Sequence, residues 1–490
     1  MSVQIFLQGK ILGIEQFLLA SSSDMDGRSH WVSLLSEVLP RALLAELALS
    51  KMLLGSSGGE QFLVVLPVEF RADAEKFLAA AAAHIDLLSS GALKLIWAST
   101  ENLGDWSVVR KRLNEAMQSK LDAPIQDEAS NGALERYFDP FVKVEPPEAV
   151  EYFSAELGRK LREAESVGWS PESPAGIQIG TGKHTWAFSA MQDGISFARH
   201  SALTDDGNHP ASTRDLAARA QGRAAWGVLR GDVDNFGIRI RRAQSIEEHV
   251  QLSVMYKQFF AGELEVLCSL PEFWRKVTLL YSGGDDFAVY GAWDALIALA
   301  REIQRLFVRF TEENLKDFPG PEGKTISMGL ALAPEGDASL ATIFEEAGQK
   351  LEIAKSSGKD CIYLFGRTLE WKQLGDAADT KQTMTRMVGE FGCPPQFLFE
   401  LASFYRDSSP LGGGKIRGRV RNDRVERPWR FHRRLNLVIE TRYTGKSKVH
   451  EFEKLRADLI SDFTGKKAAQ IRLRPAGRVA LEWARLETEA

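Results

Sequence analysis

An eight-residue repeat constrains this chain more than any other feature of its sequence. Residues 57–64 read SGGEQFLV and residues 282–289 read SGGDDFAV, so the copies share Ser-Gly-Gly, an acidic residue, Phe and Val. Each copy lies between two segments with the apolar pattern of β-strands, and each is flanked by helical patterns. The repeat therefore predicts two copies of one α+β domain.

The hydrophobic pattern around each copy predicts its secondary structure. Around the second copy we expect strands at 226–233, 276–281, 287–291, 325–333 and 361–365, and helices at 246–269, 294–315 and 339–355. The order β-α-β-β-α-β is that of a ferredoxin-like sheet. Around the first copy we expect strands at 2–8, 61–66 and 92–98 and helices at 31–54 and 71–89, with a break or kink at Pro40.

Changes in composition divide the chain into four predicted segments. Residues 122–215 are rich in Pro, Gly and Ser, with one helical stretch near 147–166, and are interpreted as a linking module. We expect a first domain at 1–121, the linking module at 122–215, a second domain at 216–375 and a helical, basic domain at 376–490. In the last segment the predicted helices are 382–391, 396–406, 430–443 and 449–463.

Composition excludes several classes of protein. The chain has three cysteines among 490 residues and no CxxC pair, which excludes a cysteine-based zinc site and fits a reducing compartment. Apolar runs stay below the roughly 18 residues that a membrane-spanning helix needs, so we expect a cytoplasmic protein without membrane contact. The net charge is −5, but residues 401–490 carry 21 Lys and Arg against 11 Asp and Glu. This basic end is the candidate for binding polyanions.

Three aspartates form the candidate catalytic group. Asp232 ends a predicted strand in GDVDNFG, and Asp285 and Asp286 lie in the predicted hairpin turn of YSGGDDFAVYG. In a ferredoxin-like sheet these segments are neighbours, so the carboxylates converge at one edge. Mg²⁺ binds through one or two carboxylates together with substrate phosphates. Gly283 and Gly284 have no Cβ and let a nucleotide approach the backbone. The pattern indicates metal-assisted nucleotidyl transfer, and the alternative is an ordinary polar hairpin.

Two lysines follow the last predicted helix of the second domain. Lys355 and Lys359 lie in KSSGKD, residues 355–360, where they could reach a triphosphate. The alternative is that they are solvated charges at a helix C-terminus.

Taken together, the GDVDNFG strand, the SGGDD hairpin, the KSSGKD segment, the degenerate first copy and the helical end resemble the large palm-domain subunit of type III CRISPR effector complexes. In that family the subunit makes cyclic oligoadenylates from ATP when the complex holds target RNA. The resemblance implies two palm domains, ATP as substrate and Mg²⁺ or Mn²⁺ as cofactor. It also implies other CRISPR effector subunits, crRNA and target RNA as partners.

The resemblance also assigns roles to residues. It implies that Asp232, Asp285 and Asp286 bind the metal ions and that Lys355 and Lys359 face phosphates. It places the nucleotide at Ser282, Gly283, Gly284, Asn235 and Phe236, with a second ATP face to face on Ser57, Gly58 and Gly59. The alternative for the first copy is a purely structural duplicate. Lys415, Arg417, Arg419, Arg421 and Arg424 are candidate contacts for RNA or a neighbouring subunit, or else a solvated face.

The sequence departs from the family pattern in two ways. None of the eight histidines is followed by Asp, so we expect a form without the HD nuclease domain and without cleavage of single-stranded DNA. The cysteines of the usual zinc site are missing, so packing must hold the linking module. The first copy has Glu60 followed by Gln61, and its first strand has no carboxylate, so it cannot assemble the same metal cluster.

Two rival functions remain open from the sequence. One is a stand-alone GGDEF-like cyclic dinucleotide synthase, which the duplicated domain and the basic helical end disfavour. The other is a non-catalytic scaffold subunit of an RNA-guided complex, which the intact carboxylates disfavour.

Overall fold

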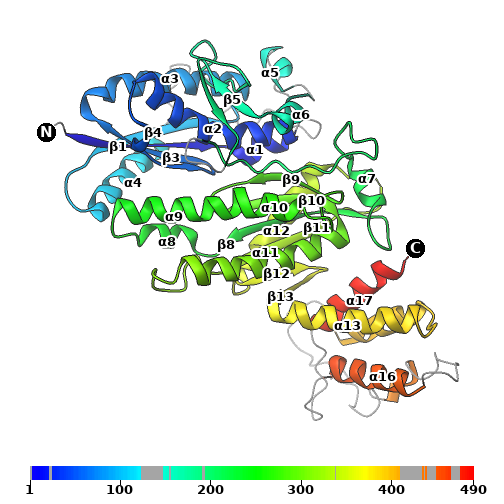
Figure 1. Cartoon of the computed structure of the whole chain (residues 1–490). Coiled ribbons are helices and arrows are strands. Elements are labelled where there is room, and N and C mark those ends of the chain that lie inside the picture. The colour runs from blue at the N-terminus through cyan, green and yellow to red at the C-terminus, as the bar shows by residue number, and fades with distance from the viewer. Residues whose placement is uncertain are drawn as a thin grey trace, which may run out of the picture.

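The structure is a computed structural model of the chain (Figure 1). It describes residues 3–20, 25–122, 147–153, 156–189, 194–336, 338–408, 433–434, 436–438, 449–464 and 475–489.

The first repeat copy lies in a βαββαβ unit, called the first unit below. Its elements are β1 (Gln4–Leu12), α1 (Ile14–Leu19), α2 (Met25–Glu46), β2 (Leu54–Gly58), β3 (Gln61–Pro67), α3 (Arg71–Leu88) and β4 (Lys94–Glu101), followed by α4 (Trp106–Asp122). The sheet is antiparallel with the order β2-β3-β1-β4. The SGGEQ turn joins β2 to β3, as the sequence predicts.

The second repeat copy lies in a larger unit, called the second unit. Its elements are β8 (Trp226–Val233), α8 (Phe236–Arg241), α9 (Ile246–Gln258), a π-helical turn (Phe259–Glu263), α10 (Leu264–Cys268), β9 (Val277–Ser282), β10 (Asp286–Ala292), α11 (Trp293–Asn314), β11 (Ile326–Leu332), α12 (Leu340–Ser356), β12 (Cys361–Leu364) and β13 (Arg367–Glu370). The sheet order is β13-β12-β11-β8-β10-β9. Its strands β11-β8-β10-β9 repeat the order β4-β1-β3-β2 of the first unit, which confirms the ferredoxin-like prediction.

The two units also share one packing detail. Gly9 pairs with Phe62 across β1 and β3, and Gly231 pairs with Phe287 across β8 and β10. A Cβ on either glycine would lie 2.2 or 2.3 Å from atoms of the facing phenylalanine ring. Each first strand therefore needs glycine at this position to seat the Phe of the repeat. The residue after each glycine, Lys10 or Asp232, occupies the same place in its sheet.

Helix α2 differs from its prediction. It begins at Met25 and ends at Glu46, and the predicted break at Pro40 is wrong because the helix continues through this residue. Pro40 removes one backbone donor, but the turns around it are buried, and burial of this apolar face stabilises the helix against the local loss. The segment predicted as its last turn instead forms a 3₁₀ turn, Lys51–Leu53, and the start of β2.

The region between the units contains a small three-stranded sheet and short helices. These are α5 (Pro147–Tyr152), α6 (Glu156–Glu163), β5 (Ser166–Trp169), β6 (Gln178–Ile179), β7 (His184–Ala187) and α7 (Thr213–Ala218), with strand order β6-β5-β7. Its buried side chains include Val167 and Trp169, which join the same apolar core as α2 and α3. The Trp31 indole N–H donates to the Ala175 carbonyl at 2.9 Å, which ties α2 to this sheet.

Helices make up the described C-terminal part of the chain. They are α13 (Trp371–Gly389), α14 (Gln396–Ser408), α16 (Val449–Thr464) and α17 (Pro475–Thr488). Helix α17 was not predicted, nor were α4, α8 and β13. Most of the predicted helix 430–443 lies outside the described residues.

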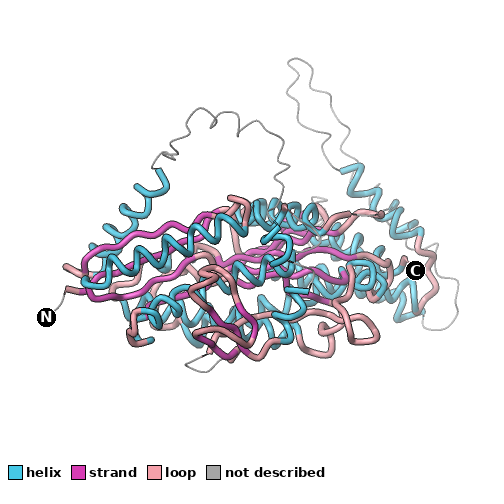
Figure 2. Tube along the Cα trace, turned by 90° about the horizontal axis from the view of Figure 1, so that it is seen from above, coloured by secondary structure: helices cyan, strands magenta, loops and turns pink. Residues whose placement is uncertain are grey.

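Two large apolar cores organise these elements. One joins the first unit, the small sheet and one face of the second sheet, and the other joins the opposite face to the C-terminal helices. In Figure 1 the second sheet accordingly lies between the first unit and the C-terminal helices. In the perpendicular view the strands run along the length of the molecule (Figure 2).

Among the described helices, none combines the length and the apolar character that crossing a bilayer requires.

Candidate active site

The fold brings the three predicted aspartates to one edge of the second sheet. Asp286, the first residue of β10, pairs directly with Asp232 on β8. The Val233 backbone N–H donates to the Asp285 carbonyl at 2.9 Å, which fixes the turn beside the strand. Residues that pair across antiparallel strands have neighbouring side chains on the same face. The register therefore places Asp232 and Asp286 side by side, with Asp285 adjacent in the turn.

Each of two carboxylates already has a polar partner. The Lys355 ammonium lies 2.8 Å from Asp232, and the Tyr281 hydroxyl donates to Asp286 at 3.0 Å. Within the described residues, no group of three or more His, Cys, Asp or Glu side chains has the geometry of a metal site. The edge therefore supplies carboxylates for a metal ion without forming a complete set of protein ligands.

The aspartates share an excess of negative charge. Burial, followed by the charge of Asp232, raises the pKa of Asp286 to about 6, against the opposing effect of the Tyr281 hydrogen bond. Burial and the charges of Asp286 and Asp232 raise the pKa of Asp285 well above its usual value. Burial also raises the pKa of Asp232, against the opposing effect of Lys355. A bound cation would relieve this repulsion.

Asp286→Asn is expected to stabilise the metal-free protein above the shifted pKa. The native state keeps the Asp286 proton up to about pH 6, whereas the unfolded chain loses it near 3.8, so stability falls as pH rises between these values. Asparagine cannot titrate, and its oxygen can still accept the Tyr281 hydrogen bond. In EDTA, denaturant titrations should give the variant about 1–2 kcal/mol more stability near pH 7 than wild type, and no gain near pH 4. An equal difference at both pH values would contradict the shift.

A cavity of about 600 Å³ opens at this edge, between the two units. The second unit contributes the three aspartates and Gly283, and the first unit contributes residues of α1, α2 and the SGGEQ turn. The first-unit residues that line it are Gly13, Ile14, Glu15, Gln16, Leu18, Ser29, Val32, Ser33, Gly59 and Glu60. The two glycine turns touch here, because a Cβ on Gly59 would lie 3.2 Å from the Gly284 nitrogen. The cavity is therefore built jointly by both repeat copies.

Arg230 is a cavity residue that the sequence analysis missed. Its guanidinium lies 4.2 Å from the centre of the Phe344 ring and 3.0 Å from a Glu15 oxygen. Arg230 and Asp232 are two residues apart on β8, so both side chains face the cavity. The two-residue spacing of Arg230 and Asp232 in WGVLRGDV could have indicated that both side chains lie on the same face of the strand. Tyr281 and Phe344, which also line the cavity, required the tertiary structure.

The first unit replaces the metal-binding pattern with an ion pair. Lys10 pairs with Gln61 across β1 and β3, the positions of Asp232 and Asp286 in the second unit. The Lys10 ammonium lies 2.8 Å from Glu60, the counterpart of Asp285. One cation, one carboxylate and one amide stand where the second unit has three carboxylates. The first unit accordingly lacks the donor set for an equivalent metal site.

Several predicted nucleotide residues do not line the cavity. Lys359 donates to the Asn235 side chain at 2.5 Å, and the Phe236 ring packs against Tyr256 with 4.9 Å between ring centres. The Ser282 hydroxyl donates to the Phe260 carbonyl at 2.6 Å. The cavity lining also omits Gly284, Lys355, Ser57 and Gly58, although Lys355 contacts Asp232 and Gly284 touches Gly59.

The structure does not describe the five basic residues that were predicted to contact RNA or a neighbouring subunit. Lys415, Arg417, Arg419, Arg421 and Arg424 lie outside the described residues.

Asp234, two residues after Asp232, has a structural role. Its carboxylate accepts hydrogen bonds from Ser327 at 2.7 Å, Thr325 at 2.8 Å and the Asp360 backbone N–H at 2.9 Å. The side chain is buried and points to the end of β11 and the segment after α12. Asp234 thus fixes the KSSGKD segment beside the catalytic edge.

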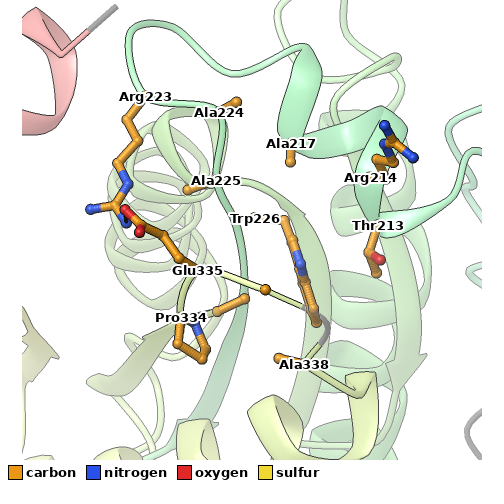
Figure 3. Close-up of a pocket in the computed structure, with 12 residues that line it drawn as sticks. Thr213, Arg214, Ala217, Arg223, Ala224, Ala225, Trp226, Pro334, Glu335 and Ala338 are labelled. Atoms are coloured by element: carbon orange, nitrogen blue, oxygen red, sulfur yellow. Dashed lines mark hydrogen bonds and ion pairs between the residues drawn. The ribbon is translucent and has the colours of Figure 1, made fainter.

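A second cavity lies at the opposite end of β8 (Figure 3). Its volume is about 390 Å³, and Glu335, a carboxylate among the described residues that line it, is paired with Arg223 at 2.6 Å. Trp226, the first residue of β8, forms one wall. The described residues of this cavity do not include the grouped carboxylates that a metal-assisted transfer requires.

Comparison with protein families identifies the unit that carries the aspartates. Residues 225–363 match the family model of the Cas10/Cmr2 second palm domain. The second unit is therefore similar to a Cas10/Cmr2 second palm domain. The second palm, as the second unit is called from here, contains the candidate catalytic edge and all three aspartates. The resemblance to the palm-domain subunit of type III CRISPR complexes is confirmed.

Curated relatives extend the same similarity. The chain is 31% identical over 182 residues to the CRISPR system single-strand-specific deoxyribonuclease Cas10/Csm1 (subtype III-A) of Mycobacterium tuberculosis, covering 33% of this chain and 21% of that protein. It is 35% identical over 109 residues to the protein of the same description from Methanocaldococcus jannaschii, covering 20% of this chain and 14% of that protein. The similarity spans about a fifth or less of the length of these relatives.

Solved structures share the whole fold. A crystal structure of a Csm1–Csm4 cassette in complex with cA4 aligns with a TM-score of 0.70 at 17% identity, over 99% of this chain and 70% of that chain. A cassette in complex with one ATP aligns with a TM-score of 0.69 at 16% identity, over the same fractions. The fold of this chain is therefore similar to that of these solved structures.

Proposed function

We propose that this chain is a type III CRISPR effector subunit that makes cyclic oligoadenylates from ATP. The observation that carries the proposal is the pairing of Asp286 with Asp232, beside Asp285, at the edge of a cavity closed by the glycine turn of the first unit. The solved Csm1 structures of this fold contain ATP in one case and cA4 in another, which supports adenine nucleotides as the ligand class.

The proposed reaction is nucleotidyl transfer between two ATP molecules. The 3′-oxygen of one ATP attacks the α-phosphorus of the other, an O3′–P bond forms, and the bond from the α-phosphorus to the bridging oxygen of pyrophosphate breaks. The hydroxyl proton is released, and pyrophosphate leaves with the bonding electron pair. Repetition extends the chain, and attack of its last 3′-oxygen on its own 5′ α-phosphorus closes the ring and releases the final pyrophosphate.

The three carboxylates could supply some, but not all, of the ligands of a divalent cation. Asp232, Asp285 and Asp286 repel one another, and only Asp232 has a cation, Lys355, within 4 Å among the described residues. Since Mg²⁺ takes one or two carboxylates and completes its shell with phosphate oxygens and water, the missing ligands would come with the nucleotide. A metal held here would stabilise charge on the attacking and leaving oxygens.

The first unit supplies the opposite wall of the cavity. Gly59 and Glu60 face the aspartates, and Ser29, Ser33 and Gln16 add uncharged polar groups from α1 and α2. This arrangement supports a second ATP bound face to face with the first, with its metal supplied from the second palm. The Lys10–Glu60 pair makes the first unit a binding surface without its own metal site.

The partners are proposed from the relatives. The solved structures pair Csm1 with Csm4, which supports assembly of this chain with other effector subunits. We infer that crRNA and target RNA bind the assembled complex and switch on synthesis, and that residues Lys415 to Arg424 contribute contacts to RNA or to a neighbouring subunit.

The test is product identification by mass spectrometry. The assembled complex is incubated with Mg²⁺ or Mn²⁺ and either ATP or GTP, with and without target RNA. Cyclic oligoadenylates that form from ATP and depend on target RNA are the expected result. A cyclic dinucleotide formed from GTP would favour a GGDEF-like synthase, and no product from either nucleotide would favour a scaffold.

A further inference from the structure

A buried ion pair joins the two units behind their glycine turns. The Lys257 ammonium of α9 lies 2.6 Å from the Glu37 carboxylate of α2, and Arg41 lies 2.7 Å from the same group. Only 5% of the Glu37 side chain and 17% of the Lys257 side chain are exposed. The pKa of Glu37 is lowered, because the charges of Lys257 and Arg41 outweigh the effect of burial. Glu37 is therefore a charged group held between two cations.

This ion pair holds the first glycine turn. The Ser57 hydroxyl donates to Glu37 at 2.9 Å and lies 3.4 Å from the Lys257 ammonium. At the next residue, a Cβ on Gly58 would lie 3.1 Å from a Glu37 oxygen. The first glycine turn therefore contacts both the Glu37 carboxylate of its own unit and the Lys257 ammonium of the second palm.

The π-helical turn that continues α9 holds the second glycine turn. Three residues after Lys257, the Phe260 carbonyl accepts the Ser282 hydroxyl at 2.6 Å. Phe260 lies in the π-helical turn, and such turns often occur at functional sites. The two serines are equivalent positions of the repeat, Ser57 in the first copy and Ser282 in the second. One helical segment therefore contacts both Ser-Gly-Gly turns, which meet at Gly59 and Gly284.

We propose that Lys257 is a positioning residue that sets the first glycine turn against the second and so aligns the two nucleotides for reaction. A buried ion pair is weak evidence for a stabilising role, because desolvation offsets most of the attraction, and its best-attested role is to specify the relative placement of the groups that it joins. The alignment of reacting groups is sensitive to displacements of about 1 Å. The alignment of nucleotides rests on the proposed function, whereas the placement of the glycine turn by Lys257 does not.

The test substitutes Lys257→Met, which keeps the aliphatic stem and leaves Glu37 paired with Arg41. Hydrogen exchange of the full-length protein should show faster exchange at residues 56–61, by roughly tenfold, with little change at residues 226–233. In the oligoadenylate assay kcat should fall about 10- to 100-fold, with a smaller change in the KM for ATP and with accumulation of linear intermediates.

Two further variants isolate the effect. Lys276→Met removes a lysine that pairs with Asp294 at 2.8 Å inside the second palm, and it should leave both readouts at wild-type values. The double variant Glu37→Gln with Lys257→Met replaces both members of the ion pair between the units by neutral side chains of similar size, with Arg41 as the remaining charge. It tests the link between the units in the absence of the Glu37 carboxylate. It should reproduce the fast exchange of the turn.

The outcomes separate this inference from the proposed function. Unchanged exchange at residues 56–61 in both Lys257 variants would overturn the positioning role, whatever the protein synthesises. Faster exchange with unchanged kcat and unchanged products would overturn the alignment of nucleotides. If the wild-type complex makes no oligoadenylate, the proposed function fails, and the exchange experiment still decides whether Lys257 holds the turn.

Discussion

Replacing Asp285 and Asp286 together with alanine is expected to lower oligoadenylate synthesis by about 10³-fold or more. The substitution removes two of the three carboxylates at the candidate catalytic edge, so under the proposed mechanism no metal would be held there to stabilise the charge that develops on the transferring phosphate. Both residues lie at the hairpin turn, and the backbone hydrogen bond from Gly283 to the Asp286 carbonyl does not depend on their side chains. The fold should therefore survive the change.

The measurement is the initial rate of product formation from ATP by mass spectrometry, with the far-UV circular dichroism and assembly of the complex checked in parallel. Glu346→Gln is the matched control, because Glu346 pairs with Lys350 on the outer part of α12 and does not line the cavity. It should retain wild-type activity. Synthesis near the wild-type rate by the double alanine variant would refute the assignment of this edge.

Asp232→Asn should raise the metal concentration required for synthesis and lower the rate at low Mg²⁺ by about 10²-fold. Asparagine fits the same space, but a neutral amide is a weaker ligand for Mg²⁺ than a carboxylate. It also leaves the Lys355 ammonium, which lies 2.8 Å from Asp232, without its main counter-charge. High Mg²⁺ or Mn²⁺ should restore part of the rate.

Titration of the rate with Mg²⁺ and with Mn²⁺ tests this prediction. Glu352→Gln serves as the control, since Glu352 lies on the same helix as Lys355, 3.8 Å from its ammonium, with most of its side chain exposed. Its titration should match that of wild type. If Asp232→Asn also gives the wild-type titration, Asp232 does not bind the metal, and the site would consist of the turn carboxylates alone.

The candidate catalytic edge could be predicted from sequence because the strand pattern and the hairpin constrain its geometry. Once the pattern of apolar residues placed β8 and the hairpin β9–β10, an antiparallel register brought Asp232 beside Asp286 with little freedom. The SGGEQ and SGGDD repeats also indicated a duplicated unit, because the same turn residues between the same strand patterns predict the same local structure. The loss of the metal donors from the first unit also followed from the residues of its strand and turn.

Other features depended on contacts that no local pattern encodes. Lys257 and Glu37 are 220 residues apart, and each alone is typical of a solvated helix face. The passage of α2 through Pro40 required the apolar core that buries this helix. The sequence by itself therefore determined which strands and turn carry the carboxylates. Only the tertiary structure decided how the two glycine turns meet, because that depends on packing and ion pairs between elements far apart in the chain.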